Sequence, residues 1–279
     1  MAISRYCDGS SIPVDSLNRQ ERRQAIKEWS EGNPFLRELL HECYRHQVKT
    51  TACCAHYPYI SVQITGSSLS KLHALFHAAE KIGNVRFQMH LNAPNPNSGP
   101  NWFQESISIS PLRGTRKNEF LCKLSLAFLS FHNQTSDIFS LLESFFLFLS
   151  GKDSELSIDV FIQNHSHYQL ILECNKNKRN AEFYSPLFTR LGLKTPDFLQ
   201  PNFPILAWEL ESNNKDAFYE QAYLILNEMK ENWTLPMRMD LSEDMPFSSK
   251  ALLMRRKLGT SPEGIQQWNE WIKANRHHP

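Results

Sequence analysis

Two adjacent thiols, an imidazole and two phenols lie within the short segment from Cys53 to Tyr59. The segment reads Cys-Cys-Ala-His-Tyr-Pro-Tyr, and the stretches on either side of it favour strands, so we expect a strand end followed by a turn. A thiol becomes a nucleophile when a nearby base or positive charge lowers its pKa. The sequence therefore points first to thiol and imidazole chemistry, with Cys54, His56 and Tyr57 as candidate catalytic residues.

Alternation along a strand determines which of the two thiols can react. If residues 50–54 form a strand, Cys53 and Cys54 point to opposite faces, so that one is buried and the other is presented. Cys54 then shares a face with His56, which could serve as its base. An alternative base is His165, in a turn that the sequence predicts between two strands.

A helix in the first third of the chain carries His73, His77 and Glu80 at positions i, i+4 and i+7. This spacing places all three on one helix face, as helical zinc ligands require. The zinc-protease pattern has a glutamate directly after the first histidine, and Ala74 stands there instead. We therefore assign no metal ligand and no cofactor from the sequence, and the question of metal binding by this helix stays open.

Glu209 and Glu211 end another predicted strand, where side chains two residues apart face the same way. Ser106 and Ser108 lie on an earlier predicted strand, and Arg86 lies upstream of both. This order of Arg, Ser-x-Ser and Glu-x-Glu resembles that of the ADP-ribosyltransferases. The resemblance implies transfer from NAD to a protein, with Glu211 as the catalytic residue and Arg86, Ser106 and Ser108 as cofactor-binding residues.

The elements that must position these groups follow from hydrophobic patterning. Apolar and polar side chains alternate over residues 58–64 and 85–91, and residues 156–174 read as a β-hairpin. Residues 136–149 are apolar almost all round, which is typical of a buried central helix. Paired strands with helices between them predict an α+β fold with a mixed or mostly antiparallel sheet.

We expect two parts along the chain. Residues 1–195 form the α+β core, and residues 196–279 form a Pro-rich connection and a helical C-terminal extension that packs on that core. The total of 30 Lys and Arg against 29 Asp and Glu gives no strong nucleic-acid signal. The longest apolar stretch, Ile138 to Leu149, is too short to span a membrane.

The N-terminus carries no apolar signal segment, so we expect the six cysteines to be reduced thiols. The chain is then cytoplasmic, or it is delivered into another cell by a route other than Sec. Three classes of function stay open. One is a small soluble enzyme that acts on a protein or nucleotide substrate through the Cys53–Tyr59 turn, and another is a non-catalytic interaction protein, such as a bacterial effector or its inhibitor. The third is an RNA-modifying or RNA-binding protein, which the net charge of +1 disfavours.

Overall fold

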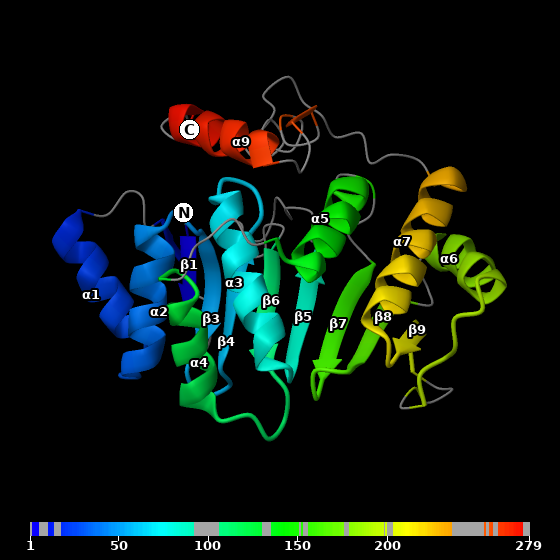
Figure 1. Ribbon diagram of the computed structural model, residues 1–279, viewed down its shortest axis with the longest axis horizontal. Helices are drawn as coiled ribbons and strands as arrows, with labels where there is room; N and C mark the ends of the chain where they lie inside the picture. Colours follow the sequence, from blue (N-terminus) through cyan, green and yellow to red (C-terminus); the bar gives the residue numbers. More distant parts are fainter. Residues whose placement is uncertain are drawn as a thin grey trace.

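The computed structural model describes residues 2–5, 11–13, 18–91, 106–129, 135–150, 152, 156–175, 179–197, 199, 203–235, 254, 257–258 and 262–275 (Figure 1). Its elements, in chain order, are β1 (Ala2–Arg5), β2 (Ser11–Pro13), α1 (Arg19–Trp29), α2 (Pro34–Arg45), β3 (Thr50–Cys54), β4 (Tyr59–Gln63), α3 (Leu69–Ile82), β5 (Val85–His90), β6 (Ser106–Pro111), α4 (Lys117–Leu126), α5 (Asp137–Leu149), β7 (Ser157–Gln163), β8 (His167–Asn175), α6 (Arg179–Arg190), β9 (Ile205–Ser212), α7 (Lys215–Glu231) and α9 (Pro262–Asn275).

One sheet of nine strands runs through the molecule in the order β2-β1-β3-β4-β6-β5-β7-β8-β9. Strands β1 and β3 pair in parallel, and the other neighbouring strands pair antiparallel. Figure 1 shows the strands side by side behind a row of helices. The α+β class and the mixed, mostly antiparallel sheet that the sequence predicts are both confirmed.

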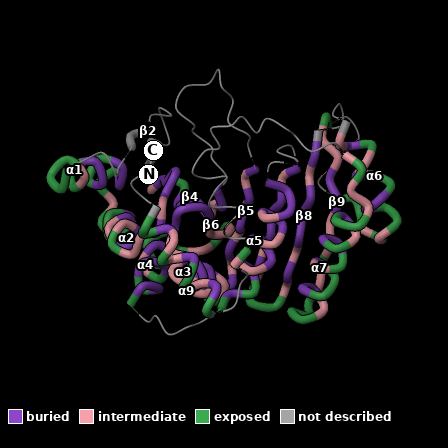
Figure 2. Tube along the Cα trace, turned by 90° about the horizontal axis from the view of Figure 1, so that it is seen from above, coloured by how far each residue is buried: buried purple, intermediate pink, exposed green. Residues whose placement is uncertain are grey.

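The helices cover one face of this sheet. Figure 2 shows α2, α3, α4, α5, α7 and α9 on the same side of it, with α1 and α6 at the two ends. Alternation along β5 explains the two faces, because Val85, Phe87 and Met89 are buried in the core while the residues between them are only half-buried. Helix α5 lies in the middle of the helical layer with nine of its thirteen residues buried, as its apolar sequence predicts.

The C-terminal helix is attached to the layer by polar contacts as well as apolar ones. Helix α3 begins after Ser68, whose side chain makes no capping bond. Asn269 of α9 takes over this role, because its Oδ1 accepts a hydrogen bond from the Leu69 N–H at 2.9 Å. The fully buried Trp268 next to it donates from Nε1 to the Ser67 carbonyl at 3.3 Å. A helix N-terminus is thus capped by a residue far along the chain.

Four other predictions concern a strand, the division of the chain, the cysteines and a membrane span. The predicted strand that carries Ser106 and Ser108 is present as β6. The division of the chain at residue 196 stays a prediction, and β9 and α7, which follow it, continue the sheet and its helical layer. The five cysteines that the structure describes are free thiols. Among the helices within the described ranges, none is both long and apolar enough to cross a membrane.

The central position of α5 predicts a large cost for opening a cavity there. Phe139 is fully buried, and its ring centroid lies 4.9 Å from that of Phe76 and 4.7 Å from that of His73. We expect Phe139→Ala to lower the free energy of unfolding by about 3–5 kcal/mol, through lost burial and a residual cavity. Urea denaturation measures this change. Leu224→Ala on the exposed side of α7 is the control and stays within about 0.5 kcal/mol of the wild type.

The cap supplied by α9 gives a second stability prediction. Asn269→Ala leaves the Leu69 N–H without its acceptor, so we expect the free energy of unfolding to fall by about 1 kcal/mol. The matched control is Gln266→Ala, which removes an exposed amide from the same helix that bonds only along the helix to Glu270. Equal urea midpoints for the two variants would contradict a capping role for Asn269.

Candidate functional site

The Cys53–Tyr59 segment forms a tight hairpin, and its turn lies at the edge of the sheet where strands β3 and β4 end and begin. Strands β3 and β4 pair with Cys54 opposite Tyr59, and residues 55–58 make the turn between them. Pro58 comes directly before β4, where a missing N–H costs no ladder bond. The predicted strand, turn and strand are therefore present, and they place His56 and Tyr57 on the exposed turn.

Cys54 itself is fully buried, so the expectation of a presented thiol at this position is wrong. The alternation was right, because Cys53 enters the hydrophobic core beside Trp29 while Cys54 lies on the opposite face. The turn folds back over Cys54, and the Tyr57 N–H donates to its Sγ at 3.3 Å. Burial is also the main cause that raises the pKa of Cys53 to about 12, so this neighbouring thiol stays protonated.

The turn between α1 and α2 brings a carboxylate to the same edge. Glu31 has a left-handed backbone, with φ of 52°, and Gly32 follows with φ of 79°. A left-handed glutamate is costly, and such residues persist only where surrounding contacts hold them. Here the Glu31 carboxylate accepts from the Ala55 N–H at 3.2 Å and lies 2.9 Å from His56 Nδ1. The strained turn therefore holds Glu31 against the hairpin.

The first turn of α4 supplies the third side of this edge. The Lys117 ammonium donates to the His56 carbonyl and lies 5.9 Å from the centre of the Tyr57 ring. Asn118 accepts a hydrogen bond from the Asn33 side chain at 3.1 Å, which joins α4 to the start of α2. Three segments that are far apart in the chain thus meet at the hairpin.

We call Glu31, Cys54, His56, Tyr57 and Lys117 the hairpin-edge cluster. Within it the Cys54 Sγ, one imidazole nitrogen of His56 and one carboxylate oxygen of Glu31 all lie within 4.8 Å of one another. The thiol is buried, whereas the side chains of His56 and Glu31 are 74% and 20% exposed. Thiol, base and orienting carboxylate are the parts that an activated nucleophile needs.

His165 does not belong to this cluster. It lies in the turn between β7 and β8, with φ of 61°, and its N–H donates to the Gly83 carbonyl at 3.1 Å. Four strand steps separate β7 from β3 in the sheet, or about 19 Å at the usual spacing. His165 is therefore not brought to Cys54 as an alternative base.

The residues of the ADP-ribosyltransferase resemblance are spread across the sheet. Arg86 on β5 binds Asp159 through two hydrogen bonds, of 2.9 and 3.3 Å. Glu211 lies three strands away on β9, about 14 Å at the usual spacing, where Gln169 donates to it at 3.2 Å. The structure therefore does not bring Glu211 together with Arg86 or with the serines of β6.

Those serines form a polar network on the sheet face opposite the helices. The Ser61 hydroxyl lies 3.2 Å from that of Ser106 and 3.0 Å from that of Ser108, and His90 Nε2 lies 3.1 Å from Ser108 Oγ. Burial, followed by the nearby Arg86, lowers the pKa of His90 to about 4. His90 is thus a neutral imidazole that belongs to the internal bonding of the sheet.

The polar face of α3 also serves the fold. His73 is buried, and its Nδ1 accepts from the Ser136 N–H at 3.2 Å. Glu80 accepts from the Ile138 N–H at 3.3 Å and from the Tyr219 hydroxyl at 3.1 Å. Burial raises the pKa of Glu80 despite these bonds. Two of the three residues with helical zinc spacing therefore hold the start of α5.

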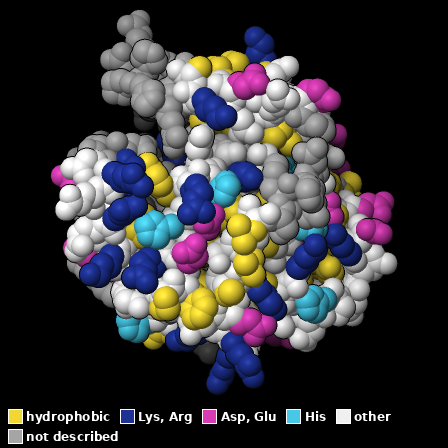
Figure 3. Space-filling model, turned by 60° about the vertical axis from the view of Figure 1, so that its left-hand side comes forward, with side chains coloured by type: hydrophobic (Ala, Val, Ile, Leu, Met, Phe, Trp, Pro, Cys, Tyr) yellow, Lys and Arg dark blue, Asp and Glu magenta, His cyan; other side chains and the backbone are white. Residues whose placement is uncertain are grey.

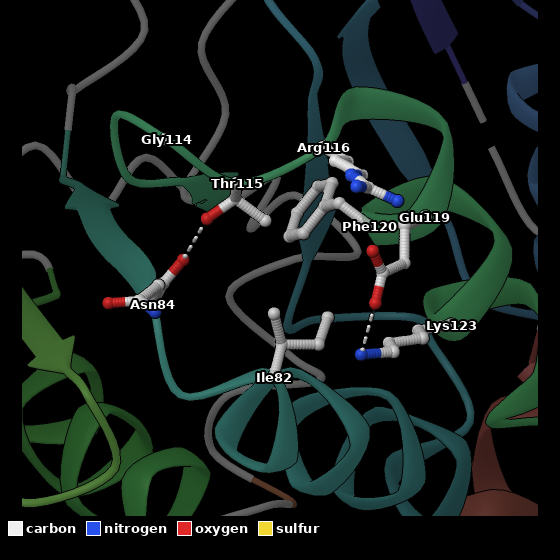
Figure 4. A pocket seen from close by; sticks show the side chains of 8 residues that line it. All are labelled: Ile82, Asn84, Gly114, Thr115, Arg116, Glu119, Phe120 and Lys123. Carbon is white, nitrogen blue, oxygen red and sulfur yellow. Dashed lines mark hydrogen bonds and ion pairs between the residues drawn. The ribbon is translucent and has the colours of Figure 1, made fainter.

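A pocket of about 260 Å³ lies beside the first turn of α4 (Figure 4). Figure 4 shows Glu119 and Lys123 paired with each other across one wall, and their ion pair is 2.8 Å long. Lys123 lowers the pKa of Glu119 through this contact. Figure 3 shows basic and acidic side chains interspersed on the α1–α2 side of the molecule, so no single sign of charge marks a partner surface there.

Sequence reasoning missed Glu31 and Lys117. The pair Glu31-Gly32 before Asn33-Pro34 signals a turn and a helix start, but no local pattern shows that this turn packs against a hairpin more than 20 residues later. For Lys117 the sequence predicts only that it belongs to a helix, and not that it reaches the hairpin. Both residues reach the site through packing of α2 and α4, which spacing along the chain does not encode.

The lowered pKa of His90 predicts a pH dependence of stability. The unfolded chain binds a proton at His90 below pH 6.5, whereas the folded protein does so only near pH 4. The folded state therefore loses stability as the pH falls from 6.5 to 4, by about 3 kcal/mol at about 1.4 kcal/mol per pKa unit.

Urea unfolding of wild type and of His90→Gln at several pH values measures this contribution. We expect the stability difference between the two proteins to shrink by about 3 kcal/mol between pH 7 and pH 4. The pKa values of His41, His46 and His77 are also lowered, mainly by burial, but they titrate in both proteins and cancel. Parallel pH profiles would contradict a neutral, buried His90.

Comparison with known proteins adds no family to this geometry. No protein-family model matches the chain, and neither a curated protein nor a solved structure is significantly similar to it. The function therefore has to be argued from the side chains that the fold brings together, and within the described part of the chain the hairpin-edge cluster places a thiol, an imidazole and a carboxylate in reach of one another.

Proposed function

We propose that the hairpin-edge cluster is the active site of a small enzyme that acts on a protein or nucleotide substrate through the Cys54 thiol and the His56 imidazole. The proposal is supported by one observation above all, the convergence of Cys54, His56 and Glu31 to within 4.8 Å. Glu31 extends the pair to three, because its carboxylate lies 2.9 Å from His56 Nδ1 and can orient the ring.

The chemistry follows from these roles. His56 accepts the proton of the Cys54 thiol, and Glu31 stabilises the imidazolium that forms. The Tyr57 N–H points at the sulfur and stabilises the thiolate by a hydrogen bond. The thiolate attacks an acyl carbon, and the leaving group departs with the proton carried by His56. Water then hydrolyses the thioester and restores the thiol.

Access to the sulfur requires movement of the turn at residues 55–58. Cys54 is fully buried under this turn, while Tyr57 is 72% exposed. Hydrogen bonds from the Ala55 N–H to Glu31 and from the Tyr57 N–H to the Cys54 sulfur hold the turn, together with the contacts of His56 with Glu31 and of Lys117 with the His56 carbonyl. A four-residue turn with exposed side chains can act as a gate that opens when substrate binds.

Alkylation by iodoacetamide at pH 7, followed residue by residue by mass spectrometry, tests the proposal. We expect His56→Gln to slow alkylation of Cys54 about tenfold or more, because the thiolate loses its base. Glu31→Gln keeps the shape of the side chain and slows alkylation less. Cys122, which is partly exposed and outside the cluster, is the internal reference and reacts at the same rate in all variants.

Two further measurements make the result decisive. Lys117→Met removes a tether of the turn, so Cys54 should alkylate faster than in the wild type while Cys122 is unchanged. Circular dichroism and urea midpoints check that each variant is folded. Equal alkylation rates of Cys54 in the wild type and in His56→Gln would refute thiol activation by His56.

A further inference from the structure

The three converging side chains of the cluster are also a set of metal ligands. Zinc binds Cys sulfur, His nitrogen and carboxylate oxygen, and catalytic zinc sites combine three protein ligands with one open position. Cys54, His56 and Glu31 offer one atom of each kind, all within 4.8 Å of one another. We propose that Glu31, Cys54 and His56 bind one Zn²⁺ ion, with water in the fourth position, and that the ion switches off the thiol chemistry of the site.

The distances fit a tetrahedral ion after small shifts. With metal–ligand bonds of about 2.0–2.3 Å, neighbouring ligand atoms of a tetrahedral zinc site lie about 3.3–3.6 Å apart. His56 Nδ1 and Glu31 Oε2, now 2.9 Å apart, would separate by a few tenths of an ångström. The sulfur already lies within 4.8 Å of both ligand atoms. The mostly exposed His56 side chain is free to make this adjustment.

Backbone hydrogen bonds hold two of the three proposed ligands, Cys54 and Glu31, as is usual for ligands in metal sites. The Tyr57 N–H bonds to the Cys54 sulfur at 3.3 Å, and the Ala55 N–H bonds to the Glu31 carboxylate at 3.2 Å. Such contacts orient the ligands and fix their charge. Glu31 also has a left-handed backbone, a costly conformation that persists only where surrounding contacts hold it. The position of its carboxylate near the thiol is therefore fixed from a separate turn.

Charge gives the reason for a divalent ion. A thiolate and a carboxylate carry two negative charges when they act as ligands, and Zn²⁺ neutralises both. Mg²⁺ and Ca²⁺ prefer oxygen ligands and do not favour coordination by the sulfur. The structure therefore favours zinc and chemically similar ions over the alkaline-earth ions.

Burial separates this inference from the proposed function. While the turn is closed, the sulfur is out of reach of a bulky substrate, whereas an ion would enter beside the exposed His56 without opening the turn. Zinc binding stands on the ligand geometry alone. Inhibition by zinc rests on the proposed function, because an ion bound to Cys54 and His56 occupies both the nucleophile and the base.

The binding test uses the full chain, reduced and freed of metal, with Zn²⁺ titrated against a chromogenic zinc chelator. We expect one tight site. Cys54→Ser and His56→Gln should each weaken the affinity by about 100-fold or more, and Glu31→Gln by at least about tenfold. Cys122→Ser, which removes a thiol outside the cluster, is the matched control and binds zinc as the wild type does.

Cobalt gives an independent signature. Co²⁺ in this site should show thiolate-to-metal charge transfer and the visible absorption of a tetrahedral ion, and both should vanish in Cys54→Ser. His56→Gln keeps the test valid if Cys54→Ser fails to fold, because His56 is exposed and not part of the core. Zinc affinity that is unchanged in all three ligand variants, or a cobalt spectrum without sulfur, would overturn the assignment.

Protection from alkylation separates this inference from the proposed function. Zinc should block the reaction of Cys54 with iodoacetamide, and a chelator should restore it, while Cys122 reacts throughout. If zinc binds through the three ligands but metal-free Cys54 shows no dependence on His56, the proposed function fails and the zinc site stands. If alkylation depends on His56 but zinc neither binds nor protects, the zinc site fails and the proposed function stands.

Discussion

The covering of one face of the sheet by helices is the constraint on which the rest of this structure depends. Val85, Phe87 and Met89 must lie under α3 and α5, so Arg86 and His90 are forced to the other face. A slip of one residue in β5 would put an arginine and a histidine into the apolar core. The same rule applied to β3 sends Cys53 into the core and leaves Cys54 on the opposite face.

The position of the hairpin-edge cluster follows from this layer. Helices α2 and α4 pack on each other, and α2 also packs on β3. The hydrogen bond between Asn33 and Asn118 joins the starts of the two helices, and both starts therefore lie near the hairpin. The α1–α2 turn then holds Glu31 over residues 55–56, and the start of α4 holds Lys117 against His56. The cluster depends on the apolar packing of two helices whose own sequences carry no sign of a site.

The sequence predicts most of the fold, but only three of the five residues of the hairpin-edge cluster. Alternation at residues 58–64 and 85–91 and the apolar run at 136–149 are local signals that identify strands and a buried helix directly. The order of strands along the chain does not reveal their order in the sheet. The sequence associates Arg86 with Glu211, whereas the structure places their strands three positions apart. Glu31 was missed because a contact between two turns leaves no periodic trace in the sequence.

The burial of Cys54 was missed for a more specific reason. Alternation decides which face a side chain points to, but whether that face is open depends on what folds over it. At Cys54 the hairpin turn bends back toward the sulfur, to which the Tyr57 N–H donates a hydrogen bond. The pattern of apolar and polar residues cannot predict such a hydrogen bond.

The contrast between a buried sulfur and an exposed imidazole sets the order of events at this site. His56 and Glu31 meet solvent first, so a proton, an ion or a substrate reaches them before it reaches Cys54. A small ion needs only the gap between the three ligands, whereas an acyl group needs the whole turn to move. On the two proposals the cluster would distinguish its occupants by size, and the strength with which Lys117 and Glu31 hold the turn would determine how readily the sulfur is exposed.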